Sequence, residues 1–139
     1  MSSYPPLLQS SSSDDVSAAI KPYKLTPTQF NTLHTDSVAA KATAYCLYSH
    51  FRVGATILTS EGEYISGANV ENASYPVGTC AERVAFGKAV VDGKIAVDRS
   101  YDGSKDGERM KGTGGKVVAL AVATDISPPA SPCGMCRQL

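Results

Sequence analysis

The stretch "RVGATILTSEGEYISGANV", from Arg52 to Val70, decides the fold of this chain. Apolar side chains alternate with other residues over 53–57, which is typical of a strand with one buried face. Turn residues follow at 61–62, and residues 63–70 have the composition of a second strand. The stretch therefore predicts an antiparallel hairpin.

A helix is expected on the N-terminal side of the hairpin. In "TPTQF" Thr26 can act as the N-cap, Pro27 suits the first helical position, and Gln29 can complete a capping box. Apolar residues then recur at near-helical spacing, so the helix is expected to reach about Tyr45. Residues 1–24 contain seven serines and little apolar surface to bury, and we expect them to form a disordered tail.

The segment that follows the hairpin alternates between loops and regular elements. Residues 71–79 are expected to form a loop, residues 80–91 a helix that ends before Gly93, and residues 98–115 a flexible, glycine-rich insertion. The apolar run "KVVALAVAT", residues 116–124, predicts a strand that is covered on both faces.

These elements together predict an α/β fold, a three-layer α/β/α sandwich over residues 25–139. Its mixed sheet would begin with the antiparallel hairpin and continue through the crossover helix to a strand parallel to its neighbour. Helices are expected on both faces of this sheet.

Length and composition exclude several classes of protein. A chain of 139 residues, 42% of them hydrophobic, fits one domain. Thirteen Lys and Arg balance thirteen Asp and Glu, whereas binding to nucleic acid normally needs a basic excess. The longest apolar run covers seven residues, and a membrane span needs about 20. No secretion signal is recognisable, so we expect a cytoplasmic protein whose cysteines are thiols or metal ligands.

Two short motifs bring cysteines and a glutamate into the pattern of a metal site. They are "TCAERVAF", which contains Cys80 and Glu82, and "SPCGMCRQL", which contains Cys133 and Cys136. Three thiolates suit zinc, and three protein ligands leave its fourth position open, as in catalytic sites. A structural zinc site or buried thiols are the alternative, for which Cys46 would be the only candidate as a fourth cysteine ligand. His34 and His50 are expected to have surface or hydrogen-bonding roles.

The residues beside the cysteines suggest chemistry at the open position. Cys80 and Cys133 are both expected at helix N-termini, where the helix dipole favours thiolates. Glu82 is close enough to exchange a proton with a water molecule at the metal. Arg83 and Arg137 could offset the negative charge of three thiolates by hydrogen-bonding to sulfur.

Three motifs, in this order, resemble the zinc-dependent cytidine deaminases: "YCLYSHFRVGA", "GANVENASYPVGTCAER" and "SPCGMCRQ". The resemblance covers residues 25–139 and points to the small homotetrameric type with three cysteine ligands. It implies that Cys80, Cys133 and Cys136 bind zinc and that Glu82 is the proton shuttle. The implied reaction is attack of zinc-bound hydroxide on C4 of cytidine, and also of deoxycytidine, with loss of ammonia, as part of pyrimidine salvage.

The resemblance also implies how the nucleoside would be bound. Phe51 matches the aromatic residue that packs on the pyrimidine, and Asn69 and Glu71 match the residues that hydrogen-bond the ribose hydroxyls. An aromatic ring suits a π-face, and an amide and a carboxylate suit a diol.

Three further positions match residues around the base and the subunit boundary. Tyr75 matches a residue near that boundary, and backbone groups around Ala81 and Ser131 match those that read the base. Two rival readings stay open: a deaminase of a modified cytosine nucleoside, and a catalytically inactive zinc-binding fragment.

Members of the resembled family continue for some tens of residues after the last motif, which here ends at Leu139. From this difference we expect the 139-residue chain, made alone, to be poorly soluble or to oligomerise irregularly, to hold zinc weakly and to deaminate cytidine slowly or not at all. A version with a family-like C-terminal extension is expected to be active.

Overall fold

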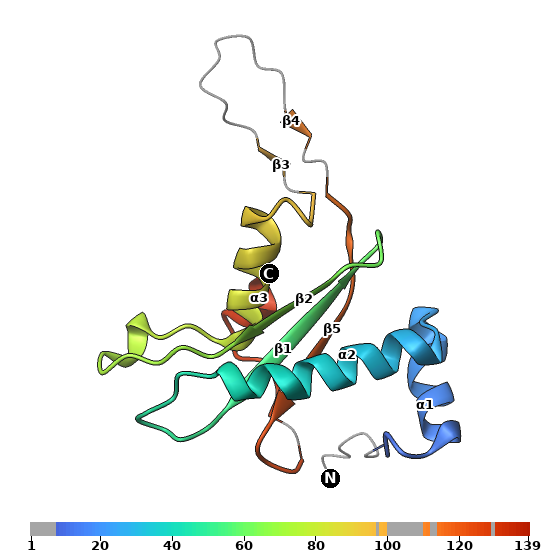
Figure 1. Cartoon of the computed structure of the whole chain (residues 1–139), viewed down its shortest axis with the longest axis horizontal. Helices are drawn as coiled ribbons and strands as arrows, with labels where there is room; N and C mark the ends of the chain where they lie inside the picture. The colour runs from blue at the N-terminus through green and yellow to red at the C-terminus, as the bar shows by residue number, and fades with distance from the viewer. Residues whose placement is uncertain (1–7, 97, 100–109, 112–113, 129) are drawn as a thin grey trace.

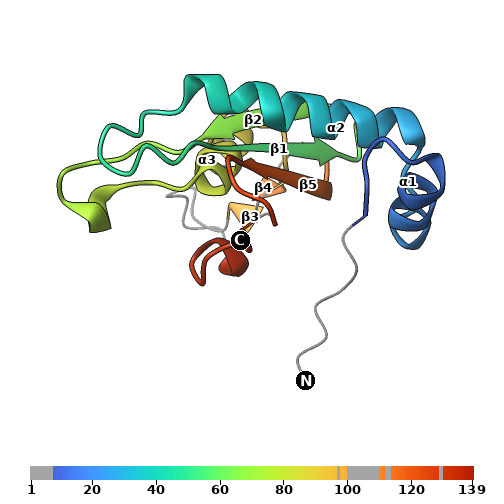
Figure 2. The same cartoon turned by 90° about the horizontal axis from the view of Figure 1, so that it is seen from below.

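The computed structural model describes residues 8–96, 98–99, 110–111, 114–128 and 130–139. A three-stranded sheet lies at its centre, in the order β2 (Tyr64–Ala68), β1 (Val53–Thr59) and β5 (Val117–Thr124). Helix α2 (Pro27–Ala40) covers one face of this sheet and helix α3 (Ala81–Val91) the other, as Figure 1 and Figure 2 show from two directions. The predicted three-layer α/β/α arrangement is therefore confirmed.

The hairpin is confirmed as the first part of the sheet. Strands β1 (Val53–Thr59) and β2 (Tyr64–Ala68) pair antiparallel, from Gly54 opposite Ala68 to Leu58 opposite Tyr64. Gly62 has a φ of 80° in the turn, a conformation that glycine adopts without a steric penalty.

The third strand corrects the predicted topology. Strand β5 (Val117–Thr124) pairs antiparallel with β1, whereas a parallel neighbour was expected. Strands β2 and β5 both run opposite to β1 and so run parallel to each other. The crossover through α3 does join two parallel strands, but it places the second strand on the far side of β1. The described sheet is for this reason entirely antiparallel and not mixed.

The predicted burial of β5 is wrong for the described residues. Val117, Val118 and Leu120 are 39%, 43% and 36% exposed. Helix α3 packs over β1 and β2, so one face of β5 lacks a covering helix in the described part of the chain. A groove of about 710 Å³, lined mainly by apolar side chains, runs between α2 and β5 and contains none of the predicted site residues.

Two glycines allow both helices to approach the sheet closely. A Cβ at Gly54 would lie 2.1 Å from the backbone oxygen of Ser37 in α2. A Cβ at Gly67 would lie 2.5 Å from the backbone nitrogen of Ala85 in α3. On the α3 side, Ala55 and Ile57 of β1 pack with Ala85 in the buried core.

Helix α2 begins as predicted. Thr26 is its N-cap, and Thr26 and Gln29 form a capping box. The α-helix ends earlier than expected, at Ala40, and continues as the 3-10 helix Lys41–Thr43.

The expectation of a disordered tail is wrong for part of the N-terminal segment. Residues Ser13–Ile20 form helix α1, and the 3-10 helix Lys21–Tyr23 follows it. The Ser12 side chain caps the helix, acidic residues occupy its first turn, and Ile20 is buried. N-terminal acidic groups interact favourably with the helix dipole, and α1 packs against α2.

Most of the predicted insertion at 98–115 lies outside the described residues. Its described parts include β3 (Asp98–Arg99) and β4 (Met110–Lys111), which pair with each other. None of the described helices has the length and the hydropathy needed to cross a membrane.

Candidate active site

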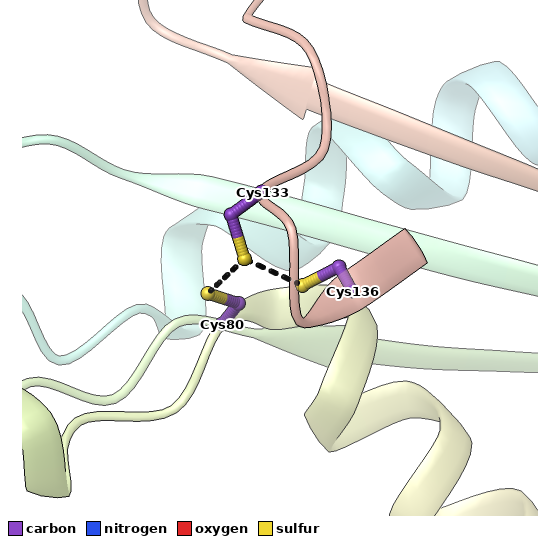
Figure 3. A group of neighbouring side chains, drawn as sticks. All are labelled: Cys80, Cys133 and Cys136. Atoms are coloured by element: carbon purple, nitrogen blue, oxygen red, sulfur yellow. Dashed lines mark hydrogen bonds between the residues drawn. The ribbon is translucent and has the colours of Figure 1, made fainter. Parts of the chain in front are cut away.

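Three cysteine sulfurs that are far apart in the sequence meet at one point (Figure 3). The Sγ atoms of Cys80 and Cys133 are 3.8 Å apart, and those of Cys133 and Cys136 are 3.4 Å apart. All three sulfurs lie within 4.8 Å of one another.

Two different elements bring the cysteines together. Cys80 is the N-cap of α3, as predicted. Cys133 and Cys136 follow β5 in a tight turn in which the Arg137 N–H donates to the Cys133 carbonyl. The helix expected to begin at Cys133 is only the 3-10 helix Cys136–Gln138, so Cys133 lies in a turn and not at the N-terminus of an α-helix.

The cluster has the dimensions of a zinc site. Tetrahedral zinc with Zn–S distances of about 2.3 Å places its sulfurs about 3.8 Å apart, close to the separations found here. Cys46 and the two histidines are not part of the cluster. Among the described residues no fourth side chain joins the three sulfurs, and three protein ligands are typical of a catalytic zinc site.

The three thiols differ in acidity. Burial raises the pKa of both Cys80 and Cys136 above the ordinary thiol value. The pKa of Cys133 is lowered, chiefly because the backbone N–H of Cys136 hydrogen-bonds its sulfur. The position of Cys80 at the start of α3 therefore does not bring the pKa of its thiol below the ordinary value, contrary to expectation.

Glu82 lies in the first turn of α3 and is only 5% exposed. It lines a pocket of about 360 Å³ together with Cys80 and Cys133. This volume lies within the range of small-molecule sites, roughly 300–1,000 Å³. A carboxylate, two metal-binding thiols and a cavity are thus found in one place.

Most of the other predicted site residues also line this pocket. They are Phe51, Asn69, Glu71, Tyr75, Arg83 and Ser131. Ala81 does not line it, because its side chain is fully buried in the core beneath α3. Tyr75 lines the pocket and is 70% exposed.

Asn69 and Glu71 hold the loop that precedes β1. The Asn69 side chain donates to the Phe51 carbonyl and accepts from the Val53 N–H, both at 2.9 Å. The Glu71 carboxylate accepts from the N–H groups of Tyr48 and Ser49 and from the Ser49 hydroxyl. These hydrogen bonds, the Ser49 hydroxyl first, lower the pKa of Glu71.

The predicted hydrogen bonds from Arg83 and Arg137 to cysteine sulfur are not found in the described structure, and both arginines contact neighbours of the cysteines instead. Arg83 Nη1 lies 3.7 Å from the sulfur of Met135. Arg137 donates to the Pro132 carbonyl at 2.9 Å and to the Ser131 hydroxyl at 2.7 Å. Arg137 therefore holds the turn that carries two of the cysteines.

Sequence reasoning missed several residues of the pocket and its support. Val53, Val122 and Met135 line the pocket, and Ser49 supports it by bonding Glu71. Val53 and Val122 are apolar residues of strands, and no sequence pattern distinguishes an apolar residue that lines a pocket from one that packs in the core. Ser49 lies within the motif "YCLYSHFRVGA", and its place beside Phe51 in that motif is the sequence feature that could have indicated a role at the site.

A family model described as "Cytidine and deoxycytidylate deaminase zinc-binding region" matches residues 27–139. A cytidine deaminase of Halalkalibacterium halodurans is 40% identical over 104 residues, which cover 75% of this chain and 64% of that protein. A cytidine deaminase of Sporosarcina psychrophila is 41% identical over 107 residues, covering 77% of this chain and 64% of the relative.

A solved structure of a cytidine deaminase from Burkholderia pseudomallei has the same fold, with a TM-score of 0.61 and 35% sequence identity. The match covers 78% of this chain and 71% of that one. The chain thus spans a little under two thirds of the length of the two relatives above.

Proposed function

The chain belongs to the cytidine and deoxycytidylate deaminase family, and from this premise we propose that it deaminates cytidine and deoxycytidine by hydrolysis. The observation that supports the proposal most directly is the meeting of three cysteines and Glu82 at one pocket. The reaction adds water at C4 of the pyrimidine, breaks the bond from C4 to its exocyclic nitrogen, and gives uridine or deoxyuridine and ammonia.

Cys80, Cys133 and Cys136 would hold the zinc ion. When bound, zinc acts as a Lewis acid that makes a water molecule acidic enough to react near neutral pH. The turn that Arg137 braces fixes the spacing of Cys133 and Cys136.

Glu82 would transfer the proton. Its carboxylate accepts a proton from the attacking water and delivers it to the exocyclic nitrogen, which leaves as ammonia. Its position in the first turn of α3, two residues after Cys80 and in the same pocket, supports a role beside the metal and not as a ligand. Burial at 5% exposure keeps bulk water from competing for that proton.

The nucleoside would bind between the β1–β2 end of the sheet and the cysteine turn. Phe51 would pack against the pyrimidine, while Asn69 and Glu71 would hydrogen-bond the ribose hydroxyls. Both polar side chains have spare capacity: the Asn69 amide has a second N–H, and a carboxylate can accept about four hydrogen bonds.

Three further contacts belong to the proposal. Backbone groups around Ala81 and Ser131 would read the base, and Tyr75 would lie near a neighbouring subunit. A homotetramer that works in cytoplasmic pyrimidine salvage, with a catalytic domain over residues 25–139, completes the proposal on the strength of the family resemblance.

Conversion of cytidine by zinc-loaded protein tests the proposed function. The assay measures uridine and ammonia for the 139-residue chain and for a version extended with the C-terminal residues of the H. halodurans relative beyond the match. We expect equal amounts of uridine and ammonia from the extended version and slower conversion by the shorter one. Absence of uridine from both versions at full zinc content would contradict the proposal.

A further inference from the structure

One serine hydroxyl joins the two parts of the pocket that would contact the nucleoside. Ser49 Oγ donates to Oε1 of Glu71, and it accepts the backbone N–H of Phe51 at 3.0 Å. The backbone N–H groups of Tyr48 and Ser49 donate to Oε2 of Glu71 at 3.0 and 3.1 Å. Both oxygens of the carboxylate are therefore held by the same short segment.

Phe51 is held on both sides of its Cα. Ser49 binds its N–H, and the Asn69 side chain binds its carbonyl at 2.9 Å. A backbone fixed at both polar groups leaves the aromatic ring only its own side-chain rotations. The orientation of the ring in the pocket wall consequently depends on Ser49 as well as on Asn69.

The loop between these two contacts has an uncommon backbone conformation. His50, between Ser49 and Phe51, has a φ of 56°, in the left-handed region. Such residues cost free energy and persist where the surrounding contacts over-determine them. The bonds from Ser49 to both Glu71 and Phe51 are contacts of this kind.

From this geometry we infer that Ser49 is a positioning residue for nucleoside binding, through Glu71 and Phe51. The inference rests on the proposed function. Glu71 accepts three hydrogen bonds from this segment, and a carboxylate has about four acceptor sites. Ser49 thus fixes the direction of Oε1, whose remaining site is free for a ribose hydroxyl, and at the same time fixes the ring that packs on the base.

Amide hydrogen exchange tests the positioning role without any catalytic readout. It compares the 139-residue chain with its Ser49→Ala and Ser49→Thr variants. The control is Ser74→Ala, an exposed serine of the neighbouring loop whose side chain makes no capping hydrogen bond. We expect the Phe51 amide to exchange at least about tenfold faster in Ser49→Ala, because it loses its acceptor. Ser49→Thr and the control should match the parent chain, and unchanged exchange in Ser49→Ala overturns the inference.

Kinetics of the extended version test the consequence for the substrate. Ser49→Ala should raise KM for cytidine about tenfold, the usual effect of one hydrogen bond to a charged group, with kcat within about twofold. KM for 2′,3′-dideoxycytidine should rise less, because this analogue has no hydroxyl for Glu71 and depends on Ser49 only through the contact of its base with Phe51. Ser49→Thr should restore KM for cytidine.

The outcomes separate this inference from the proposed function. An unchanged KM, or a loss of kcat alone, overturns the positioning role while cytidine deamination stands. Faster exchange at Phe51, combined with no uridine from either version at full zinc content, supports the hydrogen-bond bridge and contradicts the proposed function.

Discussion

The sulfur atoms of Cys80 and Cys133 lie 3.8 Å apart although the two residues are 53 positions apart in the chain. Cys80 is fixed by the start of α3, and Cys133 by the turn that follows β5. Helix α3 and β5 both pack on β1, so the metal site depends on the same sheet that forms the core.

Replacing a cysteine of the cluster should remove zinc, whereas replacing Cys46 should not. In the version with the C-terminal extension, Cys136→Ser substitutes a weak hydroxyl ligand for a buried sulfur ligand, and zinc content is expected to fall well below about one ion per chain. Cys46→Ser is the matched control, because Cys46 lies outside the cluster. Metal analysis of dialysed protein gives the result, and equal zinc in both variants would disprove the assignment of the ligands.

Glu82→Gln should separate metal binding from catalysis. The amide is nearly isosteric with the carboxylate but cannot accept a proton at neutral pH. We therefore expect full zinc content and a rate of cytidine deamination that is lower by a factor of about 10²–10⁴ or more. Zinc analysis and cytidine turnover on the same sample decide the matter. Parent-like turnover by this variant would exclude Glu82 as the proton carrier.

Gly67→Ala should destabilise the fold and loosen the metal site. The new Cβ would lie 2.5 Å from the nitrogen of Ala85 and 2.7 Å from the oxygen of Ala81. Both are backbone atoms, so α3 must move, and overpacking of this kind typically costs roughly 1–3 kcal/mol. Because Cys80 caps α3, zinc affinity should fall as well.

Gly87→Ala is the matched control for this substitution. A Cβ at Gly87 meets no atom within 4 Å in the described structure, and alanine favours the helix by up to about 1 kcal/mol over glycine. Thermal unfolding of the two variants should therefore shift in opposite directions. Equal shifts would mean that the close approach of α3 to β2 is not required.

Acid should weaken the fold partly through Asp125. Lys41 and Arg52 bind this carboxylate at 3.0 and 2.8 Å, and the Arg52 hydrogen bond is the largest cause that lowers its pKa to about 2 from 3.8. A lowered pKa stabilises the folded state above pH 3.8, and this contribution is lost as the pH falls towards 2.

The Asp125→Asn variant should accordingly lose less thermal stability than the parent between these pH values. Asp36→Asn is the control, since Asp36 makes no salt bridge in the described part of the chain. Solvent screens such exposed pairs, so added salt should reduce the difference. If the thermal stability of Asp125→Asn and of the parent fell equally as the pH is lowered, Asp125 would not be a source of the acid sensitivity.

Local signals were sufficient for the hairpin and for the starts of α2 and α3, but not for α1 or for the pairing of β5. The Thr26 and Gln29 capping box and the alternation in β1 were readable because neighbouring residues determine them. The strand with which β5 pairs depends on the side of the hairpin to which the crossover returns, and no local pattern encodes that choice. Helix α1 was missed because its stability depends on burial of Ile20 against distant residues.

The sequence was sufficient to predict the reactive residues of the candidate site but not the hydrogen bonds that hold its side chains in place. Cys80, Glu82, Cys133 and Cys136 form motifs whose residue types limit the chemistry that they can perform. The hydrogen bonds of Glu71 to the 48–49 segment depend on a loop conformation with a left-handed His50. Histidine adopts that conformation more often than most residues do, but still too rarely for its presence to predict it.

Zinc X-ray absorption spectroscopy on the metal-loaded protein tests the central claim most directly. The claim is a zinc centre with three cysteine ligands and one open position beside Glu82. We predict three sulfur neighbours at about 2.3 Å and one nitrogen or oxygen neighbour at about 2.0 Å, with a sulfur lost in Cys136→Ser and none lost in Cys46→Ser. Four sulfur neighbours, or a spectrum unaffected by Cys136→Ser, would contradict this account.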